Sequence, residues 1–286
     1  MGELKKFLDA KKADTRLLGD VERFILKRPL GDRSTTVLHP SEIIKKDWCH
    51  RYSSYLLMGG KPKTEKPSLR LQNIFDEGHS IHSKWQNRFF EMGVLYGKFQ
   101  CKVCGFIDLY TSPTVCEKCG HNLFEYKEYT LKDKNLNIVG HTDGWIKGLG
   151  NDCLIEIKSI GPGTFRMESP EMMMDADGDF MKAWKSIRRP FRSHLLQGQV
   201  YLELVKRMHG DEAPKEIVFL YELKADNDYK EFTVKANYEI VEKIFYYAEI
   251  VAKSAEDGIM MDCNIDPENG CKYCQLIEVE HAGSRA

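Results

Sequence analysis

Hydrophobic residues recur with helical spacing in two stretches of the first hundred residues. Ser41 is a suitable N-cap, and the periodicity that follows it predicts a helix over residues 41–57. Ser68 can cap a second, longer helix over residues 69–92, after a short linker rich in lysine and proline. Residues 100–121 have no helical periodicity, are rich in turn-forming residues and contain four cysteines.

Alternating apolar and polar residues predict strands in the second half of the chain. Three consecutive runs, at residues 125–133, 137–148 and 152–160, are joined by short polar turns and predict an antiparallel meander. Residues 161–180 show neither helical spacing nor strand alternation of apolar residues, and we expect a loop there. The pattern then predicts a helix at 192–210, strands at 216–224 and 230–236, and a helix at 238–258. This order of elements predicts an α/β fold in which helices flank a central sheet.

Composition limits the class of protein. A chain of 286 residues can bury one sizeable core and carry a small additional module. Its net charge is only −1, so a nucleic acid would have to be held by a local basic patch. No window approaches the roughly 18 consecutive apolar residues of a membrane span, and the first 16 residues lack the apolar stretch of a secretion signal. We therefore expect a cytoplasmic protein with no membrane partner.

Three charged side chains of the second and third predicted strands form a candidate catalytic site. Because side chains alternate along a strand, Glu156 and Lys158 project from one face of the third strand while their apolar neighbours enter the other. Asp143 ends the preceding run, and a tight turn would bring it beside Glu156. Two hard oxygen ligands beside a lysine suit Mg²⁺ or Mn²⁺, and phosphodiester hydrolysis requires such a cation with a positive group near the phosphate.

Two further motifs complete a family pattern around these residues. Asp143 followed by Glu156-Ile157-Lys158, together with the sequences GHSIH at 78–82 and QGQVY at 197–201, resembles the PD-(D/E)XK nuclease superfamily. The similarity is to its RecB/AddB-type branch, including the iron-sulfur exonucleases of CRISPR adaptation systems and their phage homologues. It covers about residues 41–274.

The resemblance implies a restriction-endonuclease-like fold with a central mixed sheet and a metal-dependent DNA exonuclease activity. It implies that Mg²⁺ or Mn²⁺ is bound by His82, Asp143, Glu156 and the main-chain carbonyl of Ile157. Lys158 would assist catalysis, while Gln197 and Tyr201 would organise that lysine and the DNA strand. The expected setting is DNA recombination, repair or phage DNA processing in a bacterial, archaeal or phage-infected cell, with a helicase or single-strand-annealing protein as a partner.

Other interpretations of the same residues stay open. An Asp…Glu-x-Lys pattern alone recurs by chance in charged strands, and His82 alone is typical of a half-buried position on an amphipathic helix. Four elements in the family order favour the nuclease. The alternatives are an endonuclease of the same fold and a non-catalytic DNA-binding or scaffolding protein.

Four of the nine cysteines have the spacing of a zinc ribbon. Cys101 and Cys104 form one Cys-x-x-Cys pair, Cys116 and Cys119 form another, and eleven residues separate them. The odd number of cysteines, in a chain expected to be intracellular, argues against disulfides. We therefore predict a zinc-ribbon insertion, with a role in gripping DNA and a purely structural role both open.

The resemblance assigns four other cysteines to a [4Fe-4S] cluster. It joins Cys49 to three cysteines of the C-terminal tail, Cys263, Cys271 and Cys274. The order of the close pair in the tail departs from the family pattern, so zinc at these thiolates, or no ligand, stays open. The ninth, Cys153, is interpreted as a small buried residue.

A basic run lies between the Glu156 strand and the Gln197 helix. Its position favours contacts with a DNA backbone. The expected DNA-binding residues are Lys182, Lys185, Arg188, Arg189 and Arg192.

We expect four parts along the chain. These are an N-terminal helical part with Cys49 and the histidine motif at 1–97, the ribbon insertion at 98–126, the nuclease core at 127–258 and a cysteine tail at 259–286 that packs back on Cys49. The oligomeric state is not indicated by the sequence.

Overall fold

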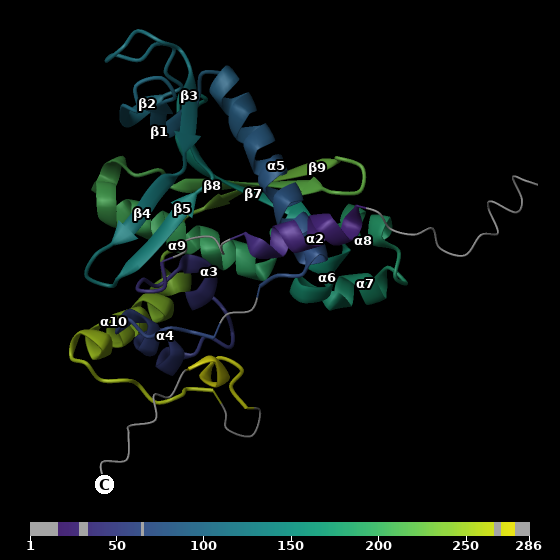
Figure 1. Ribbon diagram of the computed structural model, residues 1–286, viewed down its shortest axis with the longest axis vertical. Coiled ribbons are helices and arrows are strands. Elements are labelled where there is room, and N and C mark those ends of the chain that lie inside the picture. The colour runs from purple at the N-terminus through teal and green to yellow at the C-terminus, as the bar shows by residue number, and fades with distance from the viewer. Residues whose placement is uncertain (1–16, 29–33, 64–65, 266–269, 278–286) are drawn as a thin grey trace, which may run out of the picture. The chain divides into compact units, whose positions relative to one another are not determined.

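The computed structural model describes residues 17–28, 34–63, 66–265 and 270–277 (Figure 1). The first sixteen residues, where we expect no secretion signal, lie outside this part of the chain. The chain divides into two compact units, one formed by residues 1–33 and 64–77 and the other by 34–63 and 78–286. The first unit contains α2 (Leu18–Lys27) and the beginning of α5 (Leu69–Glu91).

The second unit contains the rest of α5 and the elements that carry all of the expected site residues. Its other described α-helices are α3 (Pro40–Ile43), α4 (His50–Leu57), α6 (Pro162–Glu168), α7 (Pro170–Asp175), α8 (Phe180–Ser186), α9 (Arg192–His209) and α10 (Glu239–Glu256). Its strands are β1 (Leu95–Cys101), β2 (Ile107–Thr111), β3 (Phe124–Lys127), β4 (Tyr129–Asp133), β5 (Ile138–Thr142), β6 (Gly144–Ile146), β7 (Cys153–Ile160), β8 (Glu216–Leu223) and β9 (Tyr229–Lys235). No helix among the described residues is long and apolar enough to cross a membrane.

The strands form one mixed sheet and one separate two-stranded sheet. The large sheet has the order β2-β1-β6-β7-β8-β9, with β3 also paired to β1. Only its β7–β8 pair is parallel, because the helices α6 to α9 intervene between these two strands and return the chain to the same end of the sheet. β4 and β5 pair with each other in the small sheet. The central mixed sheet of the expected α/β fold is therefore confirmed.

Each face of the large sheet is covered by a different set of helices. Leu154 of β7 and Phe219 of β8 are fully buried in a core that also includes residues of α8, α9 and α10. On the opposite face, Ile155 and Ile157 pack in a second core with Ile81 of α5. Glu156 and Lys158 alternate with these two isoleucines, so they face the α9 side, as their positions in the sequence predict.

The antiparallel pairing predicted for the three runs is present, but two of the runs are each divided between the large sheet and the small one. The run at 125–133 is broken at Glu128, where β3 ends and β4 begins. The run at 137–148 is broken at Asp143, where β5 ends and β6 begins. At each break the chain passes between the large sheet and the small one, so the first and second runs pair antiparallel through β4 and β5 and the second and third through β6 and β7.

Two other local predictions are wrong, and one strand was not predicted. The helix expected over 41–57 is interrupted, since α3 ends at Ile43 and α4 begins at His50 after an N-cap at Cys49, whose sulfur accepts the Tyr52 N–H at 3.4 Å. The loop expected at 161–180 contains α6 and α7, each with proline in its first turn. Strand β1 begins before the turn-rich segment and was not predicted, because pairing with β2, β3 and β6 determines it.

A glycine allows α9 to approach β8 closely. A Cβ atom at Gly198 would lie 2.5 Å from Cζ of Phe219, a ring that is fully buried and has no room to move. This close approach brings the neighbouring residue Gln197 down to the sheet. The glycine is thus required by packing rather than by its backbone conformation.

We predict that Gly198→Ala destabilises the protein. Overpacking at such a site costs about 1–3 kcal/mol, which outweighs the helix propensity of about 1 kcal/mol that alanine would add. Thermal unfolding should show a melting temperature lowered by several degrees. The control is Gly163→Ala in α6, where a Cβ would meet nothing within 4 Å. Equal stability of the two variants would contradict the packing argument.

Candidate functional site

The candidate site begins at the edge of β7 that β6 leaves uncovered. β6 pairs with β7 from Cys153 to Ile155, so the following residues of β7 lack this neighbour. The Asp143 carboxylate takes its place, because its Oδ2 accepts the Ile157 N–H at 2.5 Å. Thr142 Oγ1 donates to the Ile155 carbonyl at 2.9 Å on the same edge. The N–H and C=O of one strand residue share an edge, so the Ile157 carbonyl also faces Asp143.

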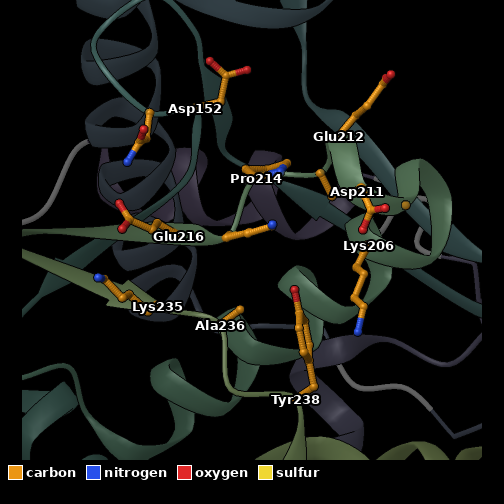
Figure 2. A pocket seen from close by; sticks show the side chains of 13 residues that line it. Asp152, Lys206, Asp211, Glu212, Pro214, Glu216, Lys235, Ala236 and Tyr238 are labelled. Atoms are coloured by element: carbon orange, nitrogen blue, oxygen red, sulfur yellow. The ribbon is translucent and has the colours of Figure 1, made fainter.

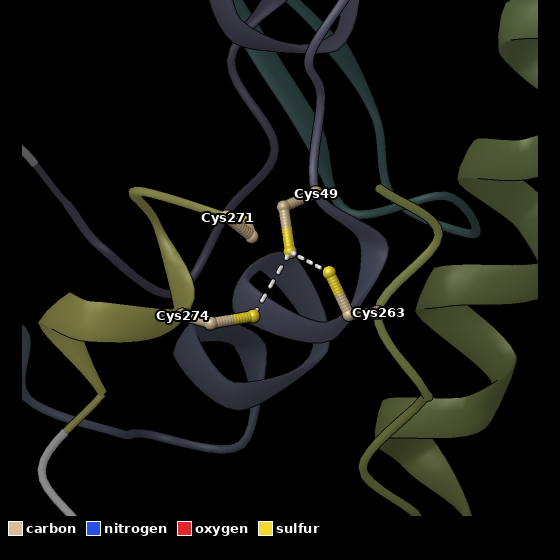
Figure 3. A group of neighbouring side chains, drawn as sticks. All are labelled: Cys49, Cys263, Cys271 and Cys274. Carbon is tan, nitrogen blue, oxygen red and sulfur yellow. Dashed lines mark hydrogen bonds between the residues drawn. The ribbon is translucent and has the colours of Figure 1, made fainter. Parts of the chain in front are cut away.

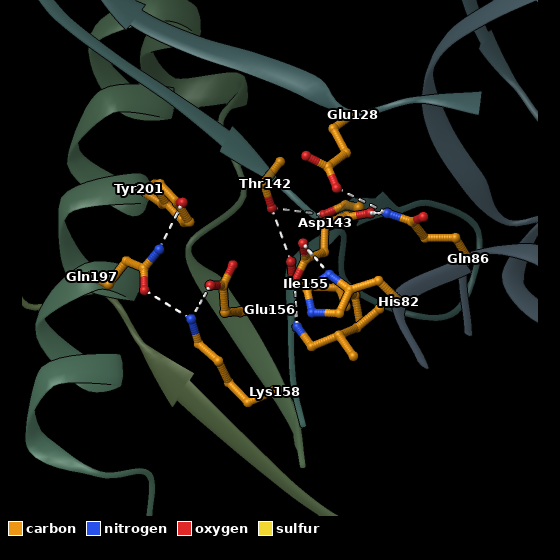
Figure 4. A network of polar contacts seen from close by, with 12 residues as sticks. His82, Gln86, Glu128, Thr142, Asp143, Ile155, Glu156, Lys158, Gln197 and Tyr201 are labelled. Carbon is orange, nitrogen blue, oxygen red and sulfur yellow. Dashed lines mark hydrogen bonds and ion pairs between the residues drawn. The ribbon is translucent and has the colours of Figure 1, made fainter. Parts of the chain in front are cut away.

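A chain of hydrogen bonds connects β7 to α9. Lys158 Nζ donates to Glu156 Oε1 at 2.7 Å and to Gln197 Oε1 at 2.9 Å. Gln197 Nε2 in turn donates to the Tyr201 hydroxyl at 2.9 Å. Figure 4 shows these four side chains on one side of Asp143. The structure therefore brings together all five residues that were predicted to be catalytic.

Helix α5 reaches the site from the other face of the sheet. His82 Nδ1 lies 3.0 Å from Asp143 Oδ1. One turn later, Gln86 Nε2 donates to the Asp143 main-chain carbonyl at 2.9 Å and lies 3.3 Å from Glu128 Oε1. The helix is fixed to β8 through Glu222, a buried carboxylate that accepts from Lys84 Nζ and Trp85 Nε1 at 2.5 and 2.6 Å. The predicted His82 thus meets Asp143, as expected.

Glu128 and Gln86 were missed by the sequence analysis. Tyr129 of β4 is paired with Thr142 of β5, so Glu128 and Asp143 are the next positions beyond the end of this ladder. The sequence does mark Glu128, because the alternation of apolar and polar residues shifts by one position within residues 125–133. The half-buried aromatic at position 126 is followed by buried residues at 129 and 131, so the apolar face changes sides at Glu128.

The site holds more negative than positive charge away from water. Burial, together with the charge of Asp143, raises the pKa of Glu156 to about 7 against the lowering effect of Lys158. Burial and the charge of Asp143 likewise raise the pKa of Glu128 to about 7. Burial lowers the pKa of Lys158, but the adjacent Glu156 carboxylate outweighs this and raises it overall. A cation would relieve the repulsion among the three carboxylates.

The side chains present fit a divalent cation. Ligand atoms of His82, Glu128 and Asp143 lie within 4.8 Å of one another. Glu156 lies outside this group, but its buried Oε2 has no hydrogen-bond partner among the described residues. Carboxylate, carbonyl and imidazole ligands together suit Mn²⁺ or Mg²⁺. Of the predicted ligands, His82 and Asp143 belong to the compact group, and Glu156 and the Ile157 carbonyl face Asp143 from β7.

The four ribbon cysteines form a compact group, as predicted. Cys101 Sγ lies 3.6 Å from Cys119 Sγ, and Cys104 Sγ lies 3.7 Å from Cys116 Sγ. A tetrahedral zinc ion with Zn–S bonds of about 2.3 Å places its sulfurs ~3.8 Å apart. Hydrogen bonding from the Cys104 N–H lowers the pKa of Cys101 to about 6, which favours a thiolate.

The two halves of the ribbon have the same backbone geometry. In each, the residue after the second cysteine is a glycine with positive φ, 73° at Gly105 and 72° at Gly120. The N–H of each glycine donates to the carbonyl of the first cysteine of its pair, at 2.9 and 2.8 Å. Glycine is the residue that adopts this left-handed conformation without strain. The local sequence Cys-x-x-Cys-Gly therefore explains both turns.

The second cysteine group joins the segment before α4 to the C-terminal tail (Figure 3). Cys49 Sγ lies 3.8 Å from Cys263 Sγ and 3.7 Å from Cys274 Sγ, and ligand atoms of all four cysteines lie within 4.8 Å. This spacing is that of sulfurs around a single ion. Four cysteine thiolates can hold either a zinc ion or an iron-sulfur cluster. Asn264 strengthens the junction by accepting the His50 N–H and donating to the Trp48 carbonyl, at 2.8 and 3.0 Å.

The predicted basic residues are exposed but do not share one environment. Arg188, Arg189 and Arg192 line a cavity of about 940 Å³ between α6–α7 and the start of α9. Glu168 also lines it and raises the pKa of Lys158, so the cavity lies close to the candidate site. Lys182 is paired instead with Asp177 at 3.1 Å, and Lys185 is not among the residues lining the cavity.

A separate cavity of about 750 Å³ lies at the other ends of β7 and β8 (Figure 2). Its walls include Asp152, Glu216 and Lys235, and Lys206 packs 3.8 Å from the centre of the Tyr238 ring. Acidic and basic side chains are mixed around it, and none of the predicted site residues is among those that line it. This cavity is therefore distinct from the candidate site.

Comparisons with known proteins place the chain only loosely. No protein-family model and no curated protein matches it. Among solved structures it is similar to an alkaline exonuclease from Laribacter hongkongensis, also solved in complex with dAMP, at 10% identity and a TM-score of 0.45 over 79% of this chain and 90% of that one. It is also similar to SSO0001, at 12% identity and a TM-score of 0.36 over 90% of this chain and 95% of that one. Both TM-scores are below 0.5.

We predict two independent metal centres in the cysteine groups. Metal analysis of anaerobically purified protein should show that Cys104→Ser loses the ribbon metal alone and that Cys49→Ser loses the other centre alone. Iron with broad visible absorbance at the Cys49 centre would identify a cluster, and a second zinc would identify an ion. The control is Cys153→Ser, since Cys153 lies outside both groups. Full metal content in the Cys49→Ser variant would contradict the prediction.

Proposed function

We propose that this chain is a metal-dependent DNA nuclease that hydrolyses phosphodiester bonds. The observation that supports it best is the position of Lys158, held between Glu156 and Gln197 beside the edge where Asp143 replaces a strand. An ammonium group fixed next to a buried cluster of carboxylates is an arrangement for a phosphate and a cation together. A purely structural ion pair would not need three carboxylates around one lysine.

The residues of the site divide the work of hydrolysis among them. A bound Mg²⁺ or Mn²⁺ supplies a positive charge against the phosphate and lowers the pKa of the attacking water. Asp143 and Glu156 would hold that cation, together with His82 and the Ile157 carbonyl. Lys158 uses two of its three N–H donors on Glu156 and Gln197, and we assign the third to the phosphate or the water. Tyr201 keeps the Gln197 amide oriented toward the lysine.

Arginine side chains provide a route for the DNA backbone to this site. The cavity lined by Arg188, Arg189 and Arg192 is bordered by Glu168, whose charge acts on Lys158. Guanidinium groups bind phosphate oxygens through paired donors. We propose that the strand reaches Lys158 along this cavity. Trp184 and Phe191 are buried and so belong to the core rather than to a base-stacking surface.

The finer assignment is to an exonuclease, which the RecB/AddB-type resemblance favours. An endonuclease of the same fold would use the same residues, and a scaffolding protein would keep the fold without turnover. The complete set of charged groups at the site favours an enzyme over a scaffold. A place in DNA recombination, repair or phage DNA processing, together with a helicase or annealing partner, forms part of the proposal.

Loss of the central carboxylates should abolish cleavage. We expect Asp143→Asn, Glu156→Gln and Lys158→Ala each to reduce the rate by at least about 10²-fold, since each removes a charge that acts on the reacting phosphate. Hydrolysis of end-labelled linear DNA with Mg²⁺ or Mn²⁺ measures this. Closed circular DNA should resist an exonuclease. The control is Glu231→Gln on an exposed position of β9. Equal activity of all four variants would sink the enzymatic proposal.

Binding of DNA should depend on the arginine cavity and on salt. In an Asp143→Asn background, we expect Arg189→Ala and Arg192→Ala each to weaken binding and to lower the slope of log Kd against log salt by about one. Lys182→Ala should have a smaller effect because its side chain is paired with Asp177. Fluorescence anisotropy over a salt series measures both quantities. A salt slope that neither arginine variant changes would exclude this path for the backbone.

A further inference from the structure

We propose that Glu128 is a further ligand of this metal centre, and that it binds the cation with His82 and Asp143 from the side of Asp143 opposite Glu156. This rests on the proposed function, since it concerns the same centre. It adds a carboxylate that the Asp…Glu-x-Lys motif does not contain. It also makes Asp143 a residue shared between two halves of the site.

The register of the small sheet places Glu128 opposite Asp143. Tyr129 and Thr142 are the terminal pair of the β4–β5 ladder, so the next residue of each strand lies beyond it. Both strands leave the small sheet at this point for the large one. The two carboxylates are therefore held by backbones that diverge from a common pair, and their separation does not depend on a flexible loop.

Side chains of α5 complete the group. His82 Nδ1 contacts Asp143, and ligand atoms of His82, Glu128 and Asp143 lie within 4.8 Å of one another. Gln86 Nε2 contacts both Glu128 and the Asp143 main chain, which holds the two acidic residues in a fixed relation. In Figure 4, His82, Gln86 and Glu128 lie on one side of Asp143, and Glu156 and Lys158 lie on the other.

The charges around Glu128 also favour a cation. Glu128 is half-buried beside the Asp143 carboxylate, and Lys158 is engaged by Glu156 on the far side. On the other side of Asp143, Oε2 of the buried Glu156 has no hydrogen-bond partner among the described residues, so this half of the centre also has an oxygen free to bind a cation. His82 is the basic group that meets these two carboxylates, and in its neutral form the imidazole, with two carboxylates beside it, makes a set of ligands that suits a divalent cation.

The alternative is that Glu128 only orients Gln86. That role predicts that replacing Glu128 lowers the stability of the metal-free protein, because a buried hydrogen bond is lost. If Glu128 is a metal ligand, replacing it should not lower the stability of the metal-free protein. Glu128→Gln keeps the shape, removes a carboxylate that repels Asp143, and should leave the metal-free melting temperature unchanged or raised.

The test uses the full chain with its cysteine metals retained and Mn²⁺ alone as the probe. Mn²⁺ binding, followed by loss of the free-ion EPR signal, should be weakened at least tenfold in Glu128→Gln. The rise in melting temperature that Mn²⁺ gives the wild type should fall correspondingly, since a ligand stabilises the state that binds it. The matched control is Glu125→Gln, an exposed carboxylate of β3 paired with Lys127. It should bind Mn²⁺ as the wild type does.

The outcomes separate this inference from the proposed function. Wild-type Mn²⁺ affinity in Glu128→Gln, with affinity lost in Asp143→Asn, would overturn the role of Glu128 and leave the nuclease proposal intact. A lowered metal-free melting temperature with unchanged affinity would assign Glu128 to structure alone and also overturn it. A wild type that cleaves DNA without measurable Mn²⁺ binding at this site would do the same. Weakened affinity in Glu128→Gln but not in Glu125→Gln supports it.

Discussion

Three carboxyl groups, those of Glu128, Asp143 and Glu156, lie close together in the interior with one lysine among them. Burying this much like charge is unfavourable, and the raised pKa values of Glu128 and Glu156 express that cost. The surrounding structure must therefore hold the groups in place, and does so through backbone pairing. Asp143 substitutes for a strand at the Ile157 N–H, and Glu128 is fixed by the end of the β4–β5 ladder.

Helices on both faces of the large sheet contribute side chains to the charged site at β7. β7 is buried over most of its length, with Ile155 and Ile157 against α5 and with Glu156 and Lys158 toward α9. Neither helix alone could reach the site, because the sheet lies between them. β6 pairs with β7 only as far as Ile155, which leaves the next part of this edge of β7 free. There His82 of α5 lies beside Asp143. Close contact at Gly198 brings Gln197 down to Lys158 from the opposite side.

The cysteine groups fix the two ends of this arrangement. The ribbon is built into the large sheet, since Cys101 ends β1 and pairs with Phe124 of β3. β3 then runs directly to Glu128. At the other end, the Cys49 group closes a span of 214 residues to Cys263, and such closure stabilises a folded chain by on the order of 5 kcal/mol. Asn264 shows that the tail also docks through contacts that need no metal.

The sequence predicted those parts of the site that local spacing determines. Glu156 and Lys158 share a strand face, Gln197 and Tyr201 share a helix face, and each cysteine pair is close in sequence, so the pattern was visible in short segments. Glu128 and Gln86 were not predicted, because their role depends on which residue lies opposite Asp143 in a ladder. The division of two predicted strands at Glu128 and Asp143 was missed for the same reason, since it is set by pairing between distant strands.

The most direct measurement is anomalous diffraction at the manganese edge from crystals of the protein soaked in Mn²⁺. The account predicts a peak beside Asp143, within about 2–2.3 Å of its carboxylate, with Glu128 and His82 or Glu156 and the Ile157 carbonyl as further ligands. Manganese bound elsewhere, with the Asp143 position empty at saturating Mn²⁺, would contradict the claim that these buried carboxylates exist to hold a cation.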